Sequence, residues 1–137
     1  MIVVVDTNVV VSGLITRDAQ AATARILDGM LAARLRYLLS LDLLSECRRV
    51  LLRPAIRGRH GLSELEVDIL LERLVRQGVL RQPAQPAIEV VRGDEHLFAL
   101  LRELPEAVLV TGDLELIRKA PEWASVLTPS DFLRWKG

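Results

Sequence analysis

Acidic residues stand at or near the ends of several apolar segments of this sequence, where carboxylates could gather around a metal ion. They are Asp6, Glu46, the adjacent pair Asp94-Glu95, and Asp113. Carboxylates that lie close together repel one another and raise one another's pKa unless a cation or a proton compensates them. Oxygen ligands without His or Cys favour Mg²⁺ or Mn²⁺ over zinc, and such ions assist phosphodiester hydrolysis. The pattern therefore points to phosphodiester chemistry.

Each acid also has a simpler explanation when it is taken alone. Asp6 and Asp113 could cap a turn or a helix, because each directly precedes a segment that can start one. Glu46 could be a solvated residue in the middle of a helix, and Asp94 and Glu95 could be ordinary acids at a helix start. Their joint placement is what favours the metal site.

Short apolar strands alternate with amphipathic helices along the chain. We expect strands over 1–5, 37–39, 107–110 and 125–127, with a weaker candidate over 88–91. We expect helices over 19–35, 40–53, 63–77, 94–103 and 114–119. The segments 53–61 and 82–85 should be exposed connections, and Thr128-Pro129 a turn. This alternation predicts an α/β fold with a parallel sheet covered on both faces.

The predicted sheet should bring two of the acids together. Sites in parallel sheets lie at the carboxyl ends of strands, where the strand order reverses. Asp6 follows the first strand, and Asp113 follows strand 107–110 after only Thr111-Gly112. We therefore expect Asp6 and Asp113 on one edge.

The helix predicted over 63–77 has a clear start. Ser63 and Glu66 have the spacing of a capping box. Its expected buried stripe is Leu65, Ile69, Leu70, Leu74 and Val75.

Length and composition predict one domain over residues 1–137. The chain is 50% hydrophobic, enough to fill one core. Lys plus Arg and Asp plus Glu number 18 each, so the whole molecule has no strong attraction for polyanions. Local basic patches would have to capture any nucleic acid. The candidate patch is Arg48, Arg49, Arg53, Arg57, Arg59 and His60, which could equally be a solvated face.

The single cysteine, Cys47, excludes an internal disulfide and a cysteine zinc site. We expect it to be buried and the protein to be cytoplasmic. Asp6 interrupts the first apolar stretch and no basic segment precedes it, so no signal peptide is expected. No window reaches the roughly 18 to 20 apolar residues that span a bilayer.

Four segments in order resemble the PIN-domain family, and in particular VapC-like ribonucleases, the toxins of toxin-antitoxin pairs. The segments are 3–12 with Asp6-Thr7-Asn8, 40–54 with Glu46, 109–113 with Thr111-Gly112-Asp113, and 127–133. The resemblance covers essentially the whole chain. It implies a single PIN-like domain with an α/β/α sandwich around a central parallel sheet.

The third acidic position departs from the family pattern. The family usually has an aspartate-rich stretch there, whereas this chain has Val91-Arg92-Gly93-Asp94-Glu95-His96. Glu95 lies 18 residues before Asp113 (113 − 95), the usual spacing of the third acid, so it is the primary candidate and Asp94 its rival. The extra methylene of a glutamate could shift a metal ion and alter activity. We expect His96 to be solvated.

The resemblance also implies the function. Asp6, Glu46, Glu95 (or Asp94) and Asp113 would hold one or two Mg²⁺ or Mn²⁺ ions for in-line attack of water on an RNA phosphodiester. Asn8, Ser12 and Thr111 would orient the carboxylates, unless they are only turn residues. The expected partners are an RNA substrate and an antitoxin protein, and the leucines of 63–77 and 94–103 allow a homodimer.

Other classes of protein compete with this interpretation. The alternative within the family is a catalytically weak module that binds RNA or protein. Phosphatases of the haloacid dehalogenase type need a second aspartate where Asn8 stands, and response-regulator receivers need an acidic pair that the first strand lacks. We therefore expect neither of these last two.

Overall fold

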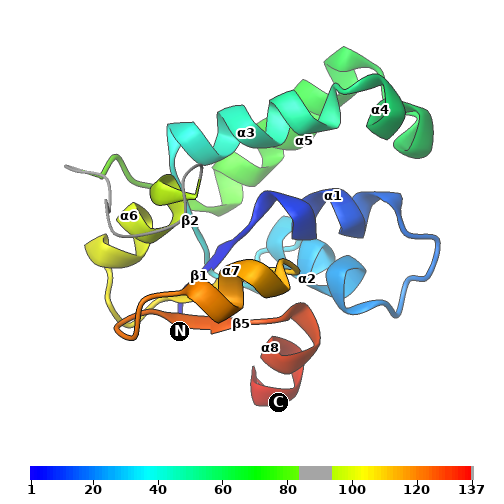
Figure 1. Ribbon diagram of the computed structural model, residues 1–137. Helices are drawn as coiled ribbons and strands as arrows, with labels where there is room; N and C mark the ends of the chain where they lie inside the picture. Colours follow the sequence, from blue (N-terminus) through cyan, green and yellow to red (C-terminus); the bar gives the residue numbers. More distant parts are fainter. Residues whose placement is uncertain (84–93, 137) are drawn as a thin grey trace.

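Parallel strands form the centre of the molecule, with helices packed around them (Figure 1). The structure, a computed structural model, describes residues 1–83 and 94–136. One sheet has the order β1-β4-β5, formed by Val3–Val5, Val108–Val110 and Ser125–Leu127. A second parallel pair, β2 (Leu38–Leu39) with β3 (Val79–Leu80), joins β1 through a parallel bridge between Val3 and Tyr37. The strand order therefore reverses between β1 and β4.

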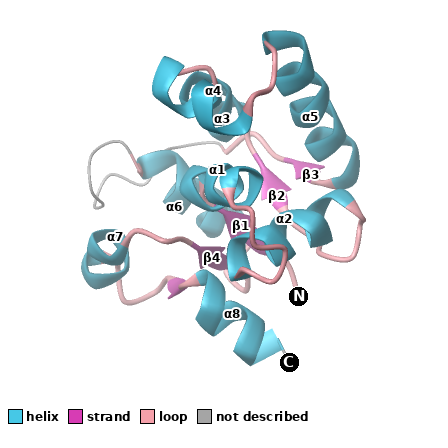
Figure 2. Ribbon diagram, turned by 90° about the vertical axis from the view of Figure 1, so that its right-hand side faces the viewer, coloured by secondary structure: helices cyan, strands magenta, loops and turns pink. Residues whose placement is uncertain are grey.

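Helices lie on both sides of the strands, with α6 on one side and α2 on the other (Figure 2). The first four are α1 (Thr7–Ile15), α2 (Ala22–Leu31), α3 (Leu41–Leu51) and α4 (Pro54–His60). The others are α5 (Glu64–Gln77), α6 (Glu95–Glu103), α7 (Leu114–Lys119) and α8 (Pro129–Lys136). The predicted α/β fold with a parallel sheet is confirmed. Within the described ranges, no helix is both long and apolar enough to cross a membrane.

The core explains why the strands are continuous apolar runs. Val3, Val4, Leu109 and Val110 are completely buried, as expected for parallel strands covered on both faces. Helix α6 is buried over the five consecutive residues 97–101, and Phe132 of α8 is also completely inaccessible. These two strands are therefore fixed by packing on every side.

Several predicted boundaries are wrong. The expected exposed connection over 53–61 contains α4, because Pro54 occupies the first turn of a new helix, where its missing N–H is no loss. The chain after Asp6 continues as the helix α1, and α8 follows the expected turn at Thr128-Pro129. Helix α2 is shorter than predicted. The strand candidate at 88–91 lies outside the described residues, whereas β3 pairs with β2 at 79–80.

Helix α5 has the predicted capping box but not the predicted face. Ser63 and Glu66 exchange hydrogen bonds of 3.0 and 3.1 Å. The predictions for Leu65, Ile69 and Val75 are wrong, since all three are exposed. The buried stripe follows the spacing i, i+3, i+4, i+7 and consists of Val67, Leu70, Leu71 and Leu74.

Helix α1 approaches α2 closely at Gly13. A Cβ atom at this position would lie 2.5 Å from the backbone oxygen of Thr23 and 3.1 Å from the Cβ of Leu27. Backbone atoms cannot move aside as a flexible side chain can, so only glycine fits without a shift of one helix. Gly13 thus sets how α1 lies on α2.

We expect Gly13→Ala to destabilise the protein by about 1–3 kcal/mol, because overpacking forces the helices apart. Gly58→Ala in α4 is the matched control, since a Cβ there has no atom within 4 Å. That control should be neutral or stabilising by up to about 1 kcal/mol. Urea denaturation of both variants measures the two effects, and equal stabilities would contradict the close approach.

Candidate active site

Asp6 joins the end of β1 to the start of α1. Its backbone N–H donates to the Val110 carbonyl at 2.9 Å, which continues the pairing with β4. Its side chain caps α1 by accepting from the Thr7 N–H at 2.7 Å. Asp6 as a whole residue is only 6% exposed. Asp6 therefore does act as a helix cap, and it also faces the edge where β1 and β4 end.

Thr111 and Asn8 connect the ends of these two strands. The buried Thr111 hydroxyl donates to Asp6 Oδ2 at 2.7 Å, and Asn8 Nδ2 donates to the same oxygen at 3.1 Å. Asn8 Oδ1 in turn accepts from the Gly112 N–H at 3.0 Å. This network fixes the orientation of the Asp6 carboxylate.

Asp113 lies on the same edge and caps α7. Its Oδ1 atom accepts from the N–H groups of Glu115 and Leu116 at 3.0 and 3.2 Å. Its own N–H donates to the Thr111 hydroxyl at 3.1 Å. The structure therefore brings Asp6 and Asp113 to one edge through a shared threonine.

Glu46 reaches this edge from α3. Its Oε1 accepts from the Thr7 hydroxyl at 2.5 Å, and its Oε2 lies 3.3 Å from Nε2 of His96 in α6. The side chain of His96 is only 14% exposed, so the expectation of a solvated histidine is wrong. Its Nδ1 is buried without a hydrogen-bond partner among the described residues. Thr7 was missed from the sequence, and His96 was considered but expected to be solvated, because neither lies near Glu46 in the chain.

Cys47 lies beside this network but is not suited to chemistry. It is buried as predicted, and its sulfur lies 3.4 Å from the Thr7 hydroxyl. Burial raises the pKa of its thiol to about 11. The thiol therefore stays protonated and behaves as a small apolar group.

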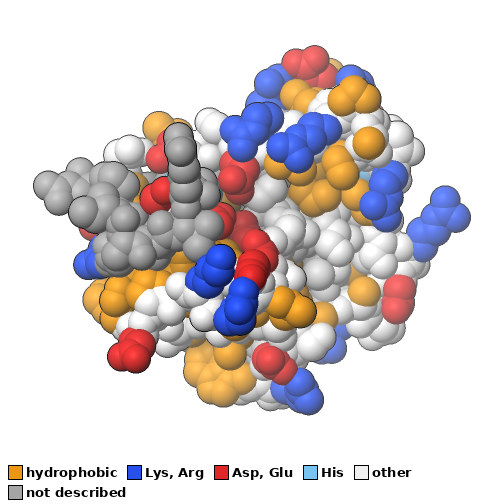
Figure 3. All heavy atoms as spheres, viewed as in Figure 1, with side chains coloured by type: hydrophobic (Ala, Val, Ile, Leu, Met, Phe, Trp, Pro, Cys, Tyr) orange, Lys and Arg blue, Asp and Glu red, His pale blue; other side chains and the backbone are white. Residues whose placement is uncertain are grey.

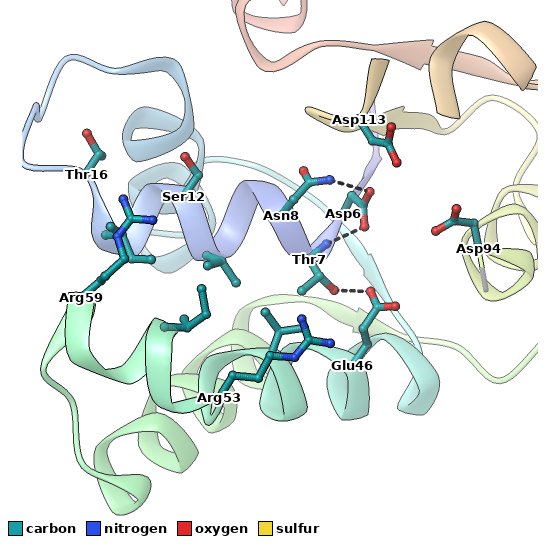
Figure 4. A pocket seen from close by; sticks show the side chains of 14 residues that line it. Asp6, Thr7, Asn8, Ser12, Thr16, Glu46, Arg53, Arg59, Asp94 and Asp113 are labelled. Atoms are coloured by element: carbon teal, nitrogen blue, oxygen red, sulfur yellow. Dashed lines mark hydrogen bonds between the residues drawn. The ribbon is translucent and has the colours of Figure 1, made fainter. Parts of the chain in front are cut away.

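A pocket of about 600 Å³ opens over the acidic edge (Figure 4). Asp6, Glu46, Asp94 and Asp113 lie at one end of it, and acidic side chains are visible at the centre of this face of the molecule (Figure 3). Glu95 instead lines an adjoining pocket of about 490 Å³ on the other side of Glu46, which borders both pockets. The geometry therefore favours Asp94 over Glu95 as the acid that joins Asp6, Glu46 and Asp113.

Ser12 lines the same pocket but is not placed with the acids. Its hydroxyl accepts a hydrogen bond from the Thr23 hydroxyl at 3.4 Å. Of the three residues expected to orient carboxylates, the structure brings Asn8 and Thr111 to Asp6 and leaves Ser12 further along the pocket (Figure 4).

The carboxylates gather negative charge at this edge, although an Arg49 guanidinium nitrogen lies 4.0 Å from Oε2 of Glu46. Burial, together with the charges of Asp6, Glu46 and Asp113, raises the pKa of Asp94 to about 6, although His96 opposes the shift. Burial also raises the pKa of Asp6, against the hydrogen bonds from Thr111 and Thr7. A cation in the pocket would relieve this repulsion.

The donor set fits a hard divalent ion in its chemistry, since it consists of carboxylate oxygens. Across the described ranges, however, no three acidic, histidine or cysteine side chains lie close enough to hold one ion together. The carboxylates would have to approach one another to share an ion. Repulsion between like charges is a physical reason for their separation.

Comparison with known proteins gives one family. The model of the PIN domain matches residues 2–115, which include every residue of the acidic edge. A comparison with curated proteins gave no match. The parallel strands, the reversal between β1 and β4 and the acidic edge agree with this family match. The chain therefore belongs to the PIN-domain family, whose members are generally nucleases.

Proposed function

We propose that the protein is a divalent-metal-dependent endoribonuclease that hydrolyses RNA phosphodiester bonds. The observation that supports this most directly is the placement of Asp6, Glu46, Asp94 and Asp113 around one end of an open pocket. The raised pKa of Asp94 adds support, because burial and the charges of Asp6, Glu46 and Asp113 act together on one carboxyl group of the pocket.

These four carboxylates would hold one or two ions, Mg²⁺ or Mn²⁺. When bound there, a divalent ion supplies Lewis-acid activation of water and neutralises charge on the phosphate. Thr111 and Asn8 hold the carboxylate of Asp6, while Thr7 holds that of Glu46. These hydrogen bonds orient the carboxylates of Asp6 and Glu46 before an ion binds.

The biological setting is a further part of the proposal. The resemblance to VapC-like toxins supports a cytoplasmic toxin with an antitoxin partner, and a homodimer remains part of this interpretation. The alternative is a PIN-like module that binds RNA or protein with little turnover. Metal binding without cleavage of any RNA would favour that module.

Asp6→Asn should reduce RNA cleavage by roughly a hundredfold or more, because it removes charge from the centre of the site. The assay is cleavage of a panel of RNAs with Mg²⁺ or Mn²⁺. Asp28→Asn, an exposed change on α2, is the control and should keep full activity. Circular dichroism checks that both variants fold. Absence of cleavage of every RNA by the folded wild-type protein would refute the proposed activity.

Asp94→Asn should impair cleavage much more than Glu95→Gln, because Asp94 lines the pocket of the acidic edge and Glu95 lines another. Single-turnover rates at saturating Mn²⁺ measure the difference. A larger loss of cleavage in Glu95→Gln than in Asp94→Asn would instead favour Glu95 as the metal ligand. Its spacing from Asp113 also favours that choice.

Asp94→Asn should also stabilise the metal-free protein at pH 7.5, by about 1 kcal/mol after allowance for solvent screening. The pKa of Asp94 is raised from 3.8 to about 6 on folding. The contribution of Asp94 to the free energy of unfolding is thus fully present below pH 3.8, and it is lost as the pH rises through 6.

Urea denaturation with a chelator measures this effect at pH 7.5 and pH 4. The gain should disappear at pH 4, and added Mn²⁺ should stabilise the wild-type protein more than the variant. A variant that is less stable than the wild type at pH 7.5 with chelator would contradict the repulsion.

A further inference from the structure

The pocket of the acidic edge has a second end of different chemistry. Arg53 lines it from the corner between α3 and α4, and Arg59 lines it from the last turn of α4. Ser12 of α1 and Thr16, just after α1, also line it. Figure 4 shows Arg59 near Ser12 and Thr16, with Arg53 between Arg59 and Glu46. One continuous pocket thus runs from carboxylates to guanidinium and hydroxyl donors.

These two arginines differ from their neighbours in the sequence. Arg48 is held by Glu64 and Asp68 at 2.7 and 2.8 Å, and the ring of His60 bonds to the Leu51 carbonyl and the Leu62 N–H. Arg53 and Arg59 form no ion pair or side-chain hydrogen bond with any described residue. Of the basic run in the sequence, these two have free donors that face the pocket.

An apolar wall connects the two ends. Val11 and Ile15 of α1 and Val50 and Ile56 of α3 and α4 also line the pocket. Such a wall can accept the sugar and base of a nucleotide, while guanidinium and hydroxyl groups bind its phosphate. The pocket therefore offers an apolar part for a sugar and base, and a basic end for a phosphate.

We propose that Arg53 and Arg59 form a subsite for a backbone phosphate of single-stranded RNA, next to the bond that is cleaved. This subsite rests on the proposed function, because the scissile phosphate is taken to lie at the acidic end. A single strand is favoured because its bases can turn into a recessed pocket, whereas those of a duplex are stacked inside. The arginines also supply local attraction that a chain of zero net charge lacks.

Binding and cleavage test the subsite separately. In the inactive Asp6→Asn background without metal, fluorescence anisotropy measures the affinity for a labelled single-stranded RNA over a range of salt. Arg53→Ala and Arg59→Ala should each weaken binding and lower the salt dependence, log Kd against log salt, by about 0.7. Arg53→Lys and Arg59→Lys should restore part of the affinity, because they retain the charge.

In the active protein, both alanine variants should raise KM with little change in kcat, because the arginines bind a part of the substrate that does not react. The difference from wild type should vanish for a dinucleotide that has only the scissile phosphate. Arg57→Ala is the matched control, since Arg57 is exposed on the same helix and does not line the pocket. It should leave both affinity and KM unchanged.

The outcomes distinguish the two proposals. If wild type cleaves no RNA but Arg53→Ala and Arg59→Ala still weaken binding, the subsite stands and the nuclease activity fails. If wild type cleaves RNA but these variants match Arg57→Ala in affinity and KM, the subsite is refuted and the activity stands. The subsite would also be refuted if the alanine variants lost binding to an acidic peptide but not to RNA. It would equally be refuted if the wild-type protein bound no RNA at all.

Discussion

The buried carboxylate of Asp6, held by hydrogen bonds from both strand ends, is the constraint on which the site depends. It accepts from Thr7 on its own side and from Thr111 on the side of β4. A charged carboxylate on a residue as buried as Asp6 is unfavourable unless such donors or a cation compensate it. The site is therefore built around a charge that the fold tolerates only because two neighbouring strands end together.

The same constraint explains how helices contribute to the edge. Thr7, the first residue of α1, donates to Glu46 and so connects α1 to α3. His96 contacts the other oxygen of Glu46 from α6. Each carboxylate oxygen of Glu46 is thus contacted from a different helix, and the position of the glutamate depends on the packing of three helices rather than on a loop.

Much of this was predictable from the sequence. The alternation of strands and helices predicted a parallel sheet, and Asp6 and Asp113 each follow a strand. Because parallel strands run in the same direction, this was enough to place the two acids on one edge. Local periodicity did not predict α4 or α8, since Pro54 and Pro129 suggest breaks although each starts a helix. The contact of His96 with Glu46 spans 50 residues, and Asp94 rather than Glu95 lines the pocket of the acidic edge. Both arise from tertiary packing, which local sequence does not contain.

The corner between α3 and α4 has a consequence for substrate length. Leu52 and Arg53 turn the chain with backbone hydrogen bonds to Arg48 and Val50, and Arg53 then accepts from Ile56 and Arg57. Glu46 and the two pocket arginines therefore belong to one stiff arm with no flexible linker between them. If RNA binds as proposed, the geometry of this arm, rather than the recognition of particular bases, would set how many nucleotides separate the reacting bond from the next anchored phosphate.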